Sequence, residues 1–247
     1  MLGMKRKVFL SVMLFAFIGS FSFAGSVCDR VSLSKIMPYM PADYRVIHKK
    51  PLKNTNLCDM LIEVNGKLFT VYANEKIAIV GTLFKNGSNI SSQEINRYLQ
   101  SQFSKNFKLY GNKLKELAIS TYKPSKKTRR FVYLVCDPNN RACEFLKRDL
   151  IDFAKKSGFG IKLILVGISQ DAQNKIERFI CNNKSFKDYT ESNYGKDISC
   201  KRAKRYISES NRLIFEELKI NSLPTFITQN GRYQAGSNLN TLKNILK

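Results

Sequence analysis

Histidine is nearly absent from this chain, and the short cysteine pairs of a zinc site are absent altogether. His48 is the only histidine in 247 residues, and no two cysteines stand two to four residues apart. A zinc ion in a protein needs three or four such ligands at close spacing. We therefore expect no metal site and no cofactor, and we interpret His48 as an ordinary structural residue rather than a catalyst.

Acidic residues are scarce. The chain has 19 Asp and Glu against 42 Lys and Arg, a formal net charge of +23. The cations are spread over the whole length, and no zinc or RNA-binding motif accompanies them, so we expect no nucleic-acid partner. The charge predicts a solvated basic surface that attracts acidic client proteins or anionic lipid.

Long apolar runs are missing except at the start of the chain. The run from Val8 to Ile18 follows the cations Lys5 to Lys7 and precedes the small residues around Ala24. This order predicts a signal peptide over residues 1–24, cleaved after Ala24, and hence an exported protein. A membrane anchor is the alternative, but the run is shorter than the roughly 20 apolar residues that span a bilayer.

Export gives the cysteines a structural meaning, because an oxidising compartment allows an even number of thiols to pair. All of them lie after the predicted cleavage site. They are Cys28, Cys58, Cys136, Cys143, Cys181 and Cys200. Sequence alone does not fix their connectivity.

Residues 25–90 are predicted to form a small α+β domain. Two strands, Leu61 to Val64 and Lys67 to Tyr72, flank Asn65-Gly66, a residue pair that accepts the positive φ angles of a tight hairpin. A third strand is expected from Lys76 to Leu83. Three short strands with one apolar face need a helix or a second copy to cover that face.

From Ser91 the apolar residues recur near helical spacing, and Ser91 to Glu94 resembles a capping box. We expect a helix within residues 91–124 that links two domains. An ordinary helix packed within either domain is the alternative. The basic segment Lys123 to Arg130 then marks a domain boundary.

Residues 125–247 alternate strand and helix. We expect a strand at Phe131 to Val135, a helix at Asn140 to Lys156 and a strand at Ile161 to Val166, an order that implies a parallel pair with a right-handed crossover. A helical insertion follows over Ala172 to Leu218. The remaining predicted elements are a strand ending in Phe226-Ile227, a turn at Asn230-Gly231, an edge strand at Arg232 to Ala235 and a short helix from Asn238.

One strand-turn-helix, Phe131 to Leu146, carries the most chemical information. The strand meets Cys136-Asp137-Pro138, and Cys143 lies in the first turn of the helix. A thioredoxin-type enzyme has C-x-x-C at this place, with a first cysteine that attacks a substrate disulfide and a second that resolves the mixed disulfide. Here the four residues are Asn140-Arg141-Ala142-Cys143, so the attacking thiol is missing.

The order of these elements resembles that of the DsbC/DsbG family of periplasmic disulfide isomerases. The resemblance covers nearly the whole mature chain. It is carried by Tyr72 to Gly81, by Asp137-Pro138, by Cys181 with Cys200 inside the helical insertion, and by Pro224-Thr225 before a strand. It implies a homodimer in which an N-terminal α+β dimerisation domain is joined by a linker helix to a C-terminal α/β thioredoxin-like fold with a helical insertion.

The resemblance also implies roles for single residues. Cys143 corresponds to the resolving cysteine, and Asn140 stands at the attacking position. Pro224 corresponds to the cis-proline that helps hold substrate, and Leu223 stands where those isomerases usually have Thr. Cys181 and Cys200 match the structural disulfide of the family. Cys28 with Cys58 is expected to form a second structural disulfide or, failing that, an intermolecular bridge.

Three interpretations of Cys143 stay open. It forms a redox pair with Cys136, which requires Cα atoms within about 7 Å. Alternatively, both are small buried residues or one inert bridge. In the third interpretation Cys143 is a lone reactive thiol.

Two functions follow from these interpretations. In the first, the protein exchanges thiols and disulfides with unfolded or misoxidised exported proteins, using Cys143, Cys136 and Pro224, and is served by a membrane-bound redox partner. In the second, it is a non-catalytic chaperone or assembly factor, for example of a secretion or conjugation apparatus. It keeps the cleft and the dimer of the family without the dithiol.

Overall fold

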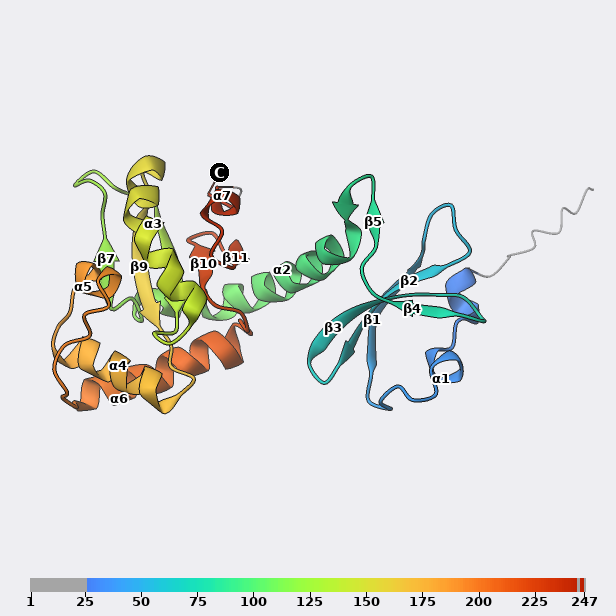
Figure 1. Ribbon diagram of the computed structural model, residues 1–247, viewed down its shortest axis with the longest axis horizontal. Helices are drawn as coiled ribbons and strands as arrows, with labels where there is room; N and C mark the ends of the chain where they lie inside the picture. Colours follow the sequence, from blue (N-terminus) through green and yellow to red (C-terminus); the bar gives the residue numbers. More distant parts are fainter. Residues whose placement is uncertain (1–25, 244, 247) are drawn as a thin grey trace, which may run out of the picture. The chain divides into compact units, whose positions relative to one another are not determined.

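The computed structural model of the protein describes residues 26–243, 245 and 246, so the predicted signal peptide and its cleavage site at Ala24 lie outside the described residues. The chain divides into two compact units, Met1–Ser91 and Ser92–Lys247. Within the described ranges, no helix is both long enough and apolar enough to cross a bilayer. Figure 1 labels the helices and strands where there is room.

The first unit is built on a four-stranded antiparallel sheet in the order β1-β2-β3-β4. The predicted hairpin is confirmed, because β2 pairs with β3 and both Asn65 (φ 50°) and Gly66 (φ 74°) have positive φ. The elements are η1 (Val27–Arg30), α1 (Leu33–Ile36), β1 (Arg45–Pro51), β2 (Cys58–Val64), β3 (Lys67–Ala73), β4 (Ala78–Val80), β5 (Phe84–Lys85) and β6 (Ser88–Asn89).

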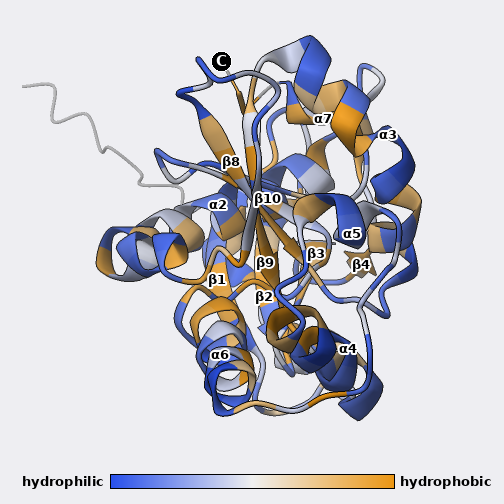
Figure 2. Ribbon diagram, turned by 90° about the vertical axis from the view of Figure 1, so that its left-hand side faces the viewer, coloured by the Kyte–Doolittle hydropathy of each residue, from blue (hydrophilic) through white to orange (hydrophobic). Residues whose placement is uncertain are grey.

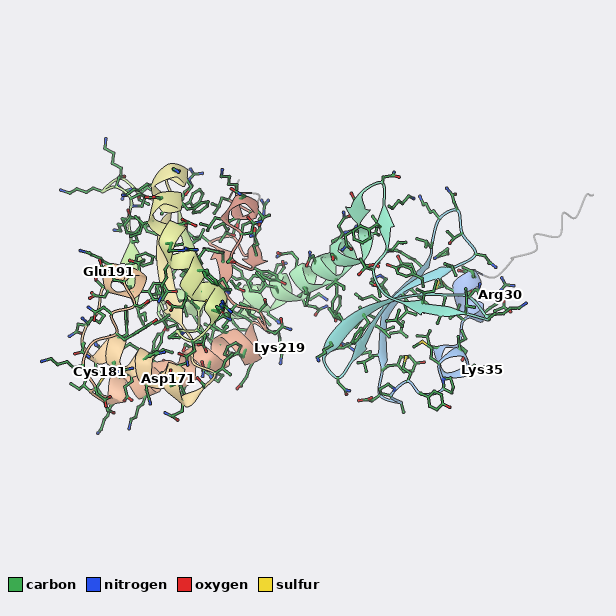
Figure 3. The ribbon with its side chains drawn as sticks, in the orientation of Figure 1. Arg30, Lys35, Asp171, Cys181, Glu191 and Lys219 are labelled. Atoms are coloured by element: carbon green, nitrogen blue, oxygen red, sulfur yellow. A yellow bond between two sulfur atoms is a disulfide. The ribbon has the colours of Figure 1, made fainter. Side chains whose placement is uncertain are left out.

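Two short helical turns, η1 and α1, cover one face of this sheet. Cys28 of η1 and Leu33 of α1 are buried against Met60, Ile62 and Val71 of the central strands. These strand residues alternate with residues of the other face, as the period of two requires. Arg30, at the end of η1, forms an ion pair with Glu75, and Figure 3 shows it at the surface.

The sheet differs from the sequence prediction at both edges. Strand β1 was not predicted, because most of its side chains are polar and exposed and no apolar alternation marks it. The predicted strand from Lys76 to Leu83 is shorter, since only Ala78–Val80 pairs with β3. The following residues instead form the small β5–β6 hairpin.

Helix α2 (Ile90–Tyr110) is shorter than the predicted helix of residues 91–124. A short 3₁₀ helix, η2 (Gly111–Lys115), and strand β7 (Ser120–Tyr122) follow it. The predicted capping box is wrong, since Ser91 lies inside the helix. Its hydroxyl bonds to the Tyr72 hydroxyl at 2.6 Å and accepts the backbone N–H of Leu83 at 2.8 Å.

The second unit contains a five-stranded sheet in the order β11-β10-β8-β9-β7, in which β8 and β9 are parallel and the other neighbours are antiparallel. A central parallel pair with an antiparallel hairpin on one side is the thioredoxin-like α/β fold. Its further elements are β8 (Phe131–Cys136), α3 (Arg141–Ser157), β9 (Gly160–Leu165), α4 (Gln170–Cys181), α5 (Phe186–Thr190), α6 (Lys201–Asn211), η3 (Arg212–Glu217), β10 (Thr225–Thr228), β11 (Tyr233–Ala235) and α7 (Leu239–Leu242).

The central strands form the core of this unit. Figure 2 shows apolar residues concentrated on β8, β9 and β10, with hydrophilic residues on the outer helices. Leu134, Leu163 and Phe226, one from each strand, are fully buried. Such runs of apolar residues are expected of strands that helices cover on both faces.

Helix α3 occupies Arg141–Ser157 because its ends are well specified. Asn140 caps its N-terminus, and Gly158 ends it in the left-handed conformation (φ 71°), which glycine adopts without steric cost. Lys155 and Lys156 lie in the last turn, where the helix dipole favours cations. The strand-turn-helix predicted from the sequence is thereby confirmed.

The helical insertion consists of α4, α5, α6 and the π-helical segment η3. In Figure 1, α4 runs alongside α6. A disulfide between Cys181 and Cys200 joins the last residue of α4 to the residue that precedes α6. Cys181 is marked in Figure 3.

Candidate functional site

The site begins where β8 ends. Cys136 is the last residue of β8, residues 137–139 turn, and Asn140 is the N-cap of α3. The Asn140 side-chain oxygen accepts the backbone N–H of Ala142 at 2.9 Å and that of Cys143 at 3.1 Å. An amide oxygen therefore binds the free N–H groups that would stabilise a thiolate at this position in an enzyme with the complete motif.

The buried side chain of Asp137 holds the turn in place. Its carboxylate is buried and accepts the backbone N–H of Asn139 at 2.7 Å and that of Ile168, in the loop after β9, at 3.0 Å. The Asn139 side chain donates to the Ser169 hydroxyl at 2.9 Å and accepts from the Lys175 ammonium at 2.7 Å. The turn before α3 is thus tied to the next βα loop, a restraint that the sequence did not predict.

Cys136 and Cys143 form a disulfide. Their Cα atoms are 5.9 Å apart, and the two residues are 0% and 1% exposed. The bond joins the end of the central strand to the first turn of α3. The interpretation of Cys143 as a lone thiol is wrong, and so is the interpretation of two separate buried thiols. An inert bridge and a redox pair remain.

Every cysteine of the chain lies in the described residues, and none is free. Cys28 is joined to Cys58 and Cys181 to Cys200, the pairings expected of structural disulfides. The first ties η1 to β2, and the second ties α4 to α6. The Cys28 and Cys58 bridge is intramolecular, so the alternative of an intermolecular bond does not apply.

The Leu223–Pro224 peptide bond is cis, the conformation that the resemblance implies. Thr225 pairs with Val135 in the antiparallel register of β10 and β8, so one step further along the ladder Pro224 stands beside Cys136. Leu223 is half-buried and packs against the core of the second unit. The Pro224 carbonyl accepts the backbone N–H of Gly236 at 2.8 Å, which holds the loop against β11. The structure therefore brings Pro224, Cys136, Cys143 and Asn140 to one end of the central strands.

A buried lysine lies beside this end of α3. The Lys147 ammonium contacts Glu144 at 2.5 Å, the Ser192 hydroxyl at 3.0 Å and the Tyr194 hydroxyl at 3.1 Å. Burial lowers the pKa of Lys147, and its hydrogen bond with Glu144 opposes that shift. Burial also raises the pKa of the Tyr194 hydroxyl. Only the Glu144 and Lys147 pair, three residues apart on one helix, was visible in the sequence.

Two apolar side chains close to the turn are exposed. Phe145, on α3, is 50% exposed and has the guanidinium groups of Arg141 and Arg148 at 5.4 and 5.6 Å from its ring centre. Ile168, which the buried Asp137 holds through its backbone, is 72% exposed. The surface beside the start of α3 thus combines apolar and cationic groups.

No protein-family model and no curated protein matches this chain. Solved structures with a similar fold include DsbG of Helicobacter pylori, 19% identical over 75% of this chain and 93% of that chain, with a TM-score of 0.41. A linker-deletion variant of ScsC from Proteus mirabilis is 12% identical, with 63% and 85% covered and a TM-score of 0.45. The thiol-disulfide exchange protein alpha-DsbA2 of Wolbachia pipientis is 10% identical, with 62% and 96% covered and a TM-score of 0.43.

These solved structures are of the DsbG, ScsC and DsbA types. At these levels of identity the comparison concerns the fold and not the activity. The order and direction of the strands in the second unit identify a thioredoxin-like fold independently of this comparison.

Proposed function

We propose that this protein is an exported, DsbC/DsbG-like factor that binds unfolded or misoxidised proteins in the periplasm and acts on them as a chaperone or assembly factor without exchanging disulfides. One observation supports this most directly. Asn140 fills the attacking position, and the sulfur of Cys143 is buried in a bond with Cys136. Thiol-disulfide exchange needs a sulfur that a thiolate can reach.

The same observation gives the Cys136–Cys143 bond a structural role. It fastens the first turn of α3 to β8, while Asn140 satisfies the N–H groups of that turn. These contacts stabilise the conformation of the end of the domain that carries the cis-proline, and they do so without a nucleophile. Phe145 and Ile168 offer apolar contacts there, and the surrounding cations favour acidic clients.

The proposed compartment fits the cysteine chemistry. Three disulfides are formed in the described residues, and such bonds persist in oxidising compartments. The proposed homodimer is supported by β4, which lies at the edge of the first unit's sheet. Ile79 and Val80 on this strand are both about half exposed. An apolar edge strand is a surface on which a second copy of the strand pairs.

Thiol-disulfide exchange through Cys136 and Cys143 is the second candidate, and the position of the pair beside Pro224 favours it. In this mechanism a client thiolate attacks the Cys143 sulfur and breaks its bond with Cys136. The second client thiol then displaces Cys143, so the client becomes oxidised and the pair is left as two thiols. A membrane-bound oxidant regenerates the bond. The first turn of α3 must open for the attack to occur.

Three assays separate these functions. Reduction of insulin and reactivation of scrambled ribonuclease are measured for the wild-type protein and for the double variant Cys136→Ala/Cys143→Ala, and suppression of client aggregation is measured for both. We expect no turnover from the wild type and aggregation suppression from both proteins, as long as the variant remains folded. Wild-type turnover that the double substitution abolishes contradicts the non-catalytic function and supports exchange. Cys181→Ala/Cys200→Ala, which removes a disulfide away from the start of α3, is the control, and circular dichroism verifies folding.

A further inference from the structure

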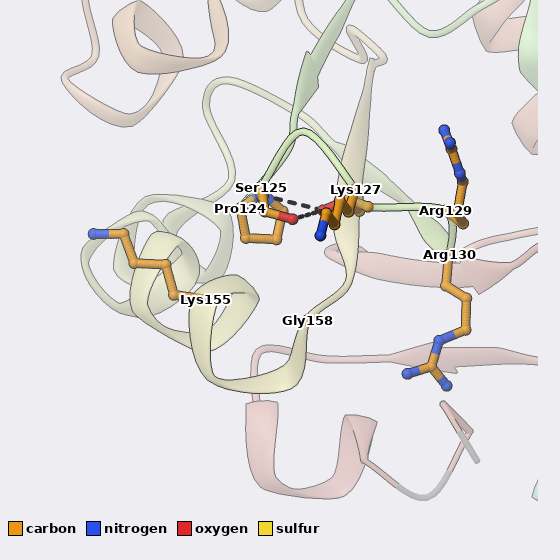
Figure 4. A pocket seen from close by; sticks show the side chains of 8 residues that line it. Pro124, Ser125, Lys127, Arg129, Arg130, Lys155 and Gly158 are labelled. Carbon is orange, nitrogen blue, oxygen red and sulfur yellow. Dashed lines mark hydrogen bonds between the residues drawn. The ribbon is translucent and has the colours of Figure 1, made fainter.

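The connection between β7 and β8 is unusually rich in cations. Residues 123–130 include Lys123, Lys126, Lys127, Arg129 and Arg130. Together with the C-terminal end of α3, this connection encloses a pocket of about 420 Å³, shown in Figure 4. The pocket is lined by Pro124, Ser125, Lys127, Thr128, Arg129, Arg130, Lys155 and Gly158, with no acidic residue among them.

Within the described part of the chain, the cations around this pocket are not neutralised. Among the described residues, no carboxylate lies within ion-pair distance of Lys127, Arg129, Arg130 or Lys155. Some cations elsewhere in the second unit, such as Lys113, are paired with a glutamate or an aspartate. Unpaired like charges around one hollow create a positive potential that attracts anions.

The pocket also carries hydroxyl groups in a fixed turn. The backbone N–H of Thr128 donates to the Ser125 carbonyl at 3.2 Å, and the backbone N–H of Ser125 donates to the Thr128 hydroxyl at 3.2 Å. The two hydroxyl oxygens are 3.4 Å apart. In Figure 4, Lys155 lies on one side of this turn, and Arg129 with Arg130 lies on the other.

Arg130 is held in place by an aromatic ring. Its guanidinium carbon lies 4.3 Å from the centre of the Phe159 ring, a distance typical of a cation–π contact. Such a stacked guanidinium loses less conformational freedom when it binds a ligand than a free side chain does. The backbone of Arg130 is also joined to the backbone that follows Phe159, because the Arg130 carbonyl accepts the N–H of Gly160 at 2.8 Å.

From this arrangement we propose that the pocket binds a phosphate group. Guanidinium, ammonium and hydroxyl groups are the donors that bind phosphate oxygens in proteins. The dipole of α3 disfavours an anion at its C-terminal end. A ligand therefore has to gain its affinity from the side-chain cations. Such a site favours a group of high charge density, as phosphate is. The volume suits one or two phosphate groups rather than a folded acidic segment. The phosphate belongs either to a soluble compound or to an anionic phospholipid.

Binding is tested with pyrophosphate and with vesicles. The full mature chain is titrated with pyrophosphate in a calorimeter, and its sedimentation with vesicles of phosphatidylglycerol and phosphatidylcholine is compared with that on phosphatidylcholine alone. The pocket variant is Lys127→Ala/Arg129→Ala. The matched control, Lys201→Ala/Lys204→Ala, removes the same charge from exposed positions of α6. Circular dichroism establishes that both variants fold.

We expect the pocket variant to bind at least one of these probes about tenfold more weakly, the usual effect of losing a charge-assisted hydrogen bond, and the control to be nearly unchanged. Binding of pyrophosphate alone identifies a soluble ligand, and vesicle binding that pyrophosphate displaces identifies a lipid headgroup. Either result supports the site.

Equal weakening in both variants shows a response to net charge and overturns the proposed phosphate site. The absence of binding to both probes also overturns it. Binding to polyglutamate that depends on the pocket and resists pyrophosphate assigns the surface to acidic protein and also overturns it.

Discussion

Asn140 is the single residue that separates this site from a complete C-x-x-C motif. Its side chain caps α3 at the position where a thiolate would bind the same N–H groups. Installing a thiol there tests whether the rest of the site is still suited to exchange. Because Cys143 is bonded to Cys136, that bond has to be removed at the same time.

We predict that Asn140→Cys/Cys136→Ala reduces insulin, whereas Cys136→Ala alone does not. The introduced cysteine would sit at a helix N-terminus, which lowers the pKa of a thiol and makes it nucleophilic. Cys143 would then act as the resolving thiol. Insulin turbidity and the pH dependence of alkylation are the measurements. A folded double variant without activity would show that the surroundings of α3 have lost more than one sulfur.

The cap itself has a measurable effect on stability. Replacing Asn140 by Ala leaves the N–H groups of Ala142 and Cys143 without their partner, so we expect a loss of about 1 kcal/mol in the free energy of unfolding. Asn140→Ser, which keeps an acceptor, should lose less. Urea denaturation of the three proteins provides the comparison, and equal stabilities would contradict the capping role.

Asp188 makes stability depend on acid pH. Its carboxylate accepts the Ser185 hydroxyl at 2.6 Å and the Ser185 backbone N–H at 2.9 Å, and these bonds with the help of Lys184 lower its pKa to about 2. The unfolded chain has a value of about 3.9. A lowered folded pKa contributes stability above about pH 4 that is lost as the pH falls towards 2.

Asp188→Asn should therefore flatten the dependence of unfolding free energy on pH between about 4 and 2, relative to the wild type. Asp149→Asn removes the same charge from an exposed position of α3 and serves as the control. Denaturant titrations at several pH values measure the slope. Parallel curves for wild type and Asp188→Asn would contradict the assignment.

At the scale of elements, the insertion depends on its disulfide. Cys181 and Cys200 are 19 residues apart and join α4 to α6. In the chain-entropy model, a bond that closes a loop of this size stabilises the folded state by about 3 kcal/mol. We expect Cys181→Ser/Cys200→Ser to lower the unfolding free energy by about that amount, measured by denaturation under oxidising conditions. A change below about 1 kcal/mol would show that helix packing alone holds the insertion.

Elements with strong local signals could be predicted from the sequence. The β2–β3 hairpin follows from Asn65-Gly66, and α3 follows from Asn140 at one end and Gly158 at the other. Strands β1 and β7 were not predicted, since β1 is mostly polar and β7 spans only Ser120–Tyr122. Their partners, not their own residues, determine that they are strands.

The site shows the same division. The position of Cys143 in the first turn of a helix was visible in local sequence, as was the missing thiol at Asn140. Its bond with Cys136 was not, because pairing depends on how α3 packs against the end of β8. The contact of Asp137 with Ile168 and the cluster around Lys147 join segments distant in sequence, and one sequence carries no record of such contacts.

At the scale of the whole molecule, the proposed homodimer depends on the edge of the first unit's sheet. We predict that Ile79→Lys/Val80→Lys, which charges β4, halves the mass measured by light scattering at micromolar concentration. Ile168→Lys charges a more exposed apolar residue of the second unit and should leave the mass unchanged. A wild-type protein that is already monomeric would refute the dimer.

The inaccessibility of the Cys136 and Cys143 sulfurs has a consequence for how the protein matures. An oxidase can act only on thiols that it reaches, and these two are out of reach once α3 has packed. Their bond must then form while the domain is still assembling. The protein therefore needs an oxidant during its own folding, and material made in a reducing cytosol will emerge with this link open.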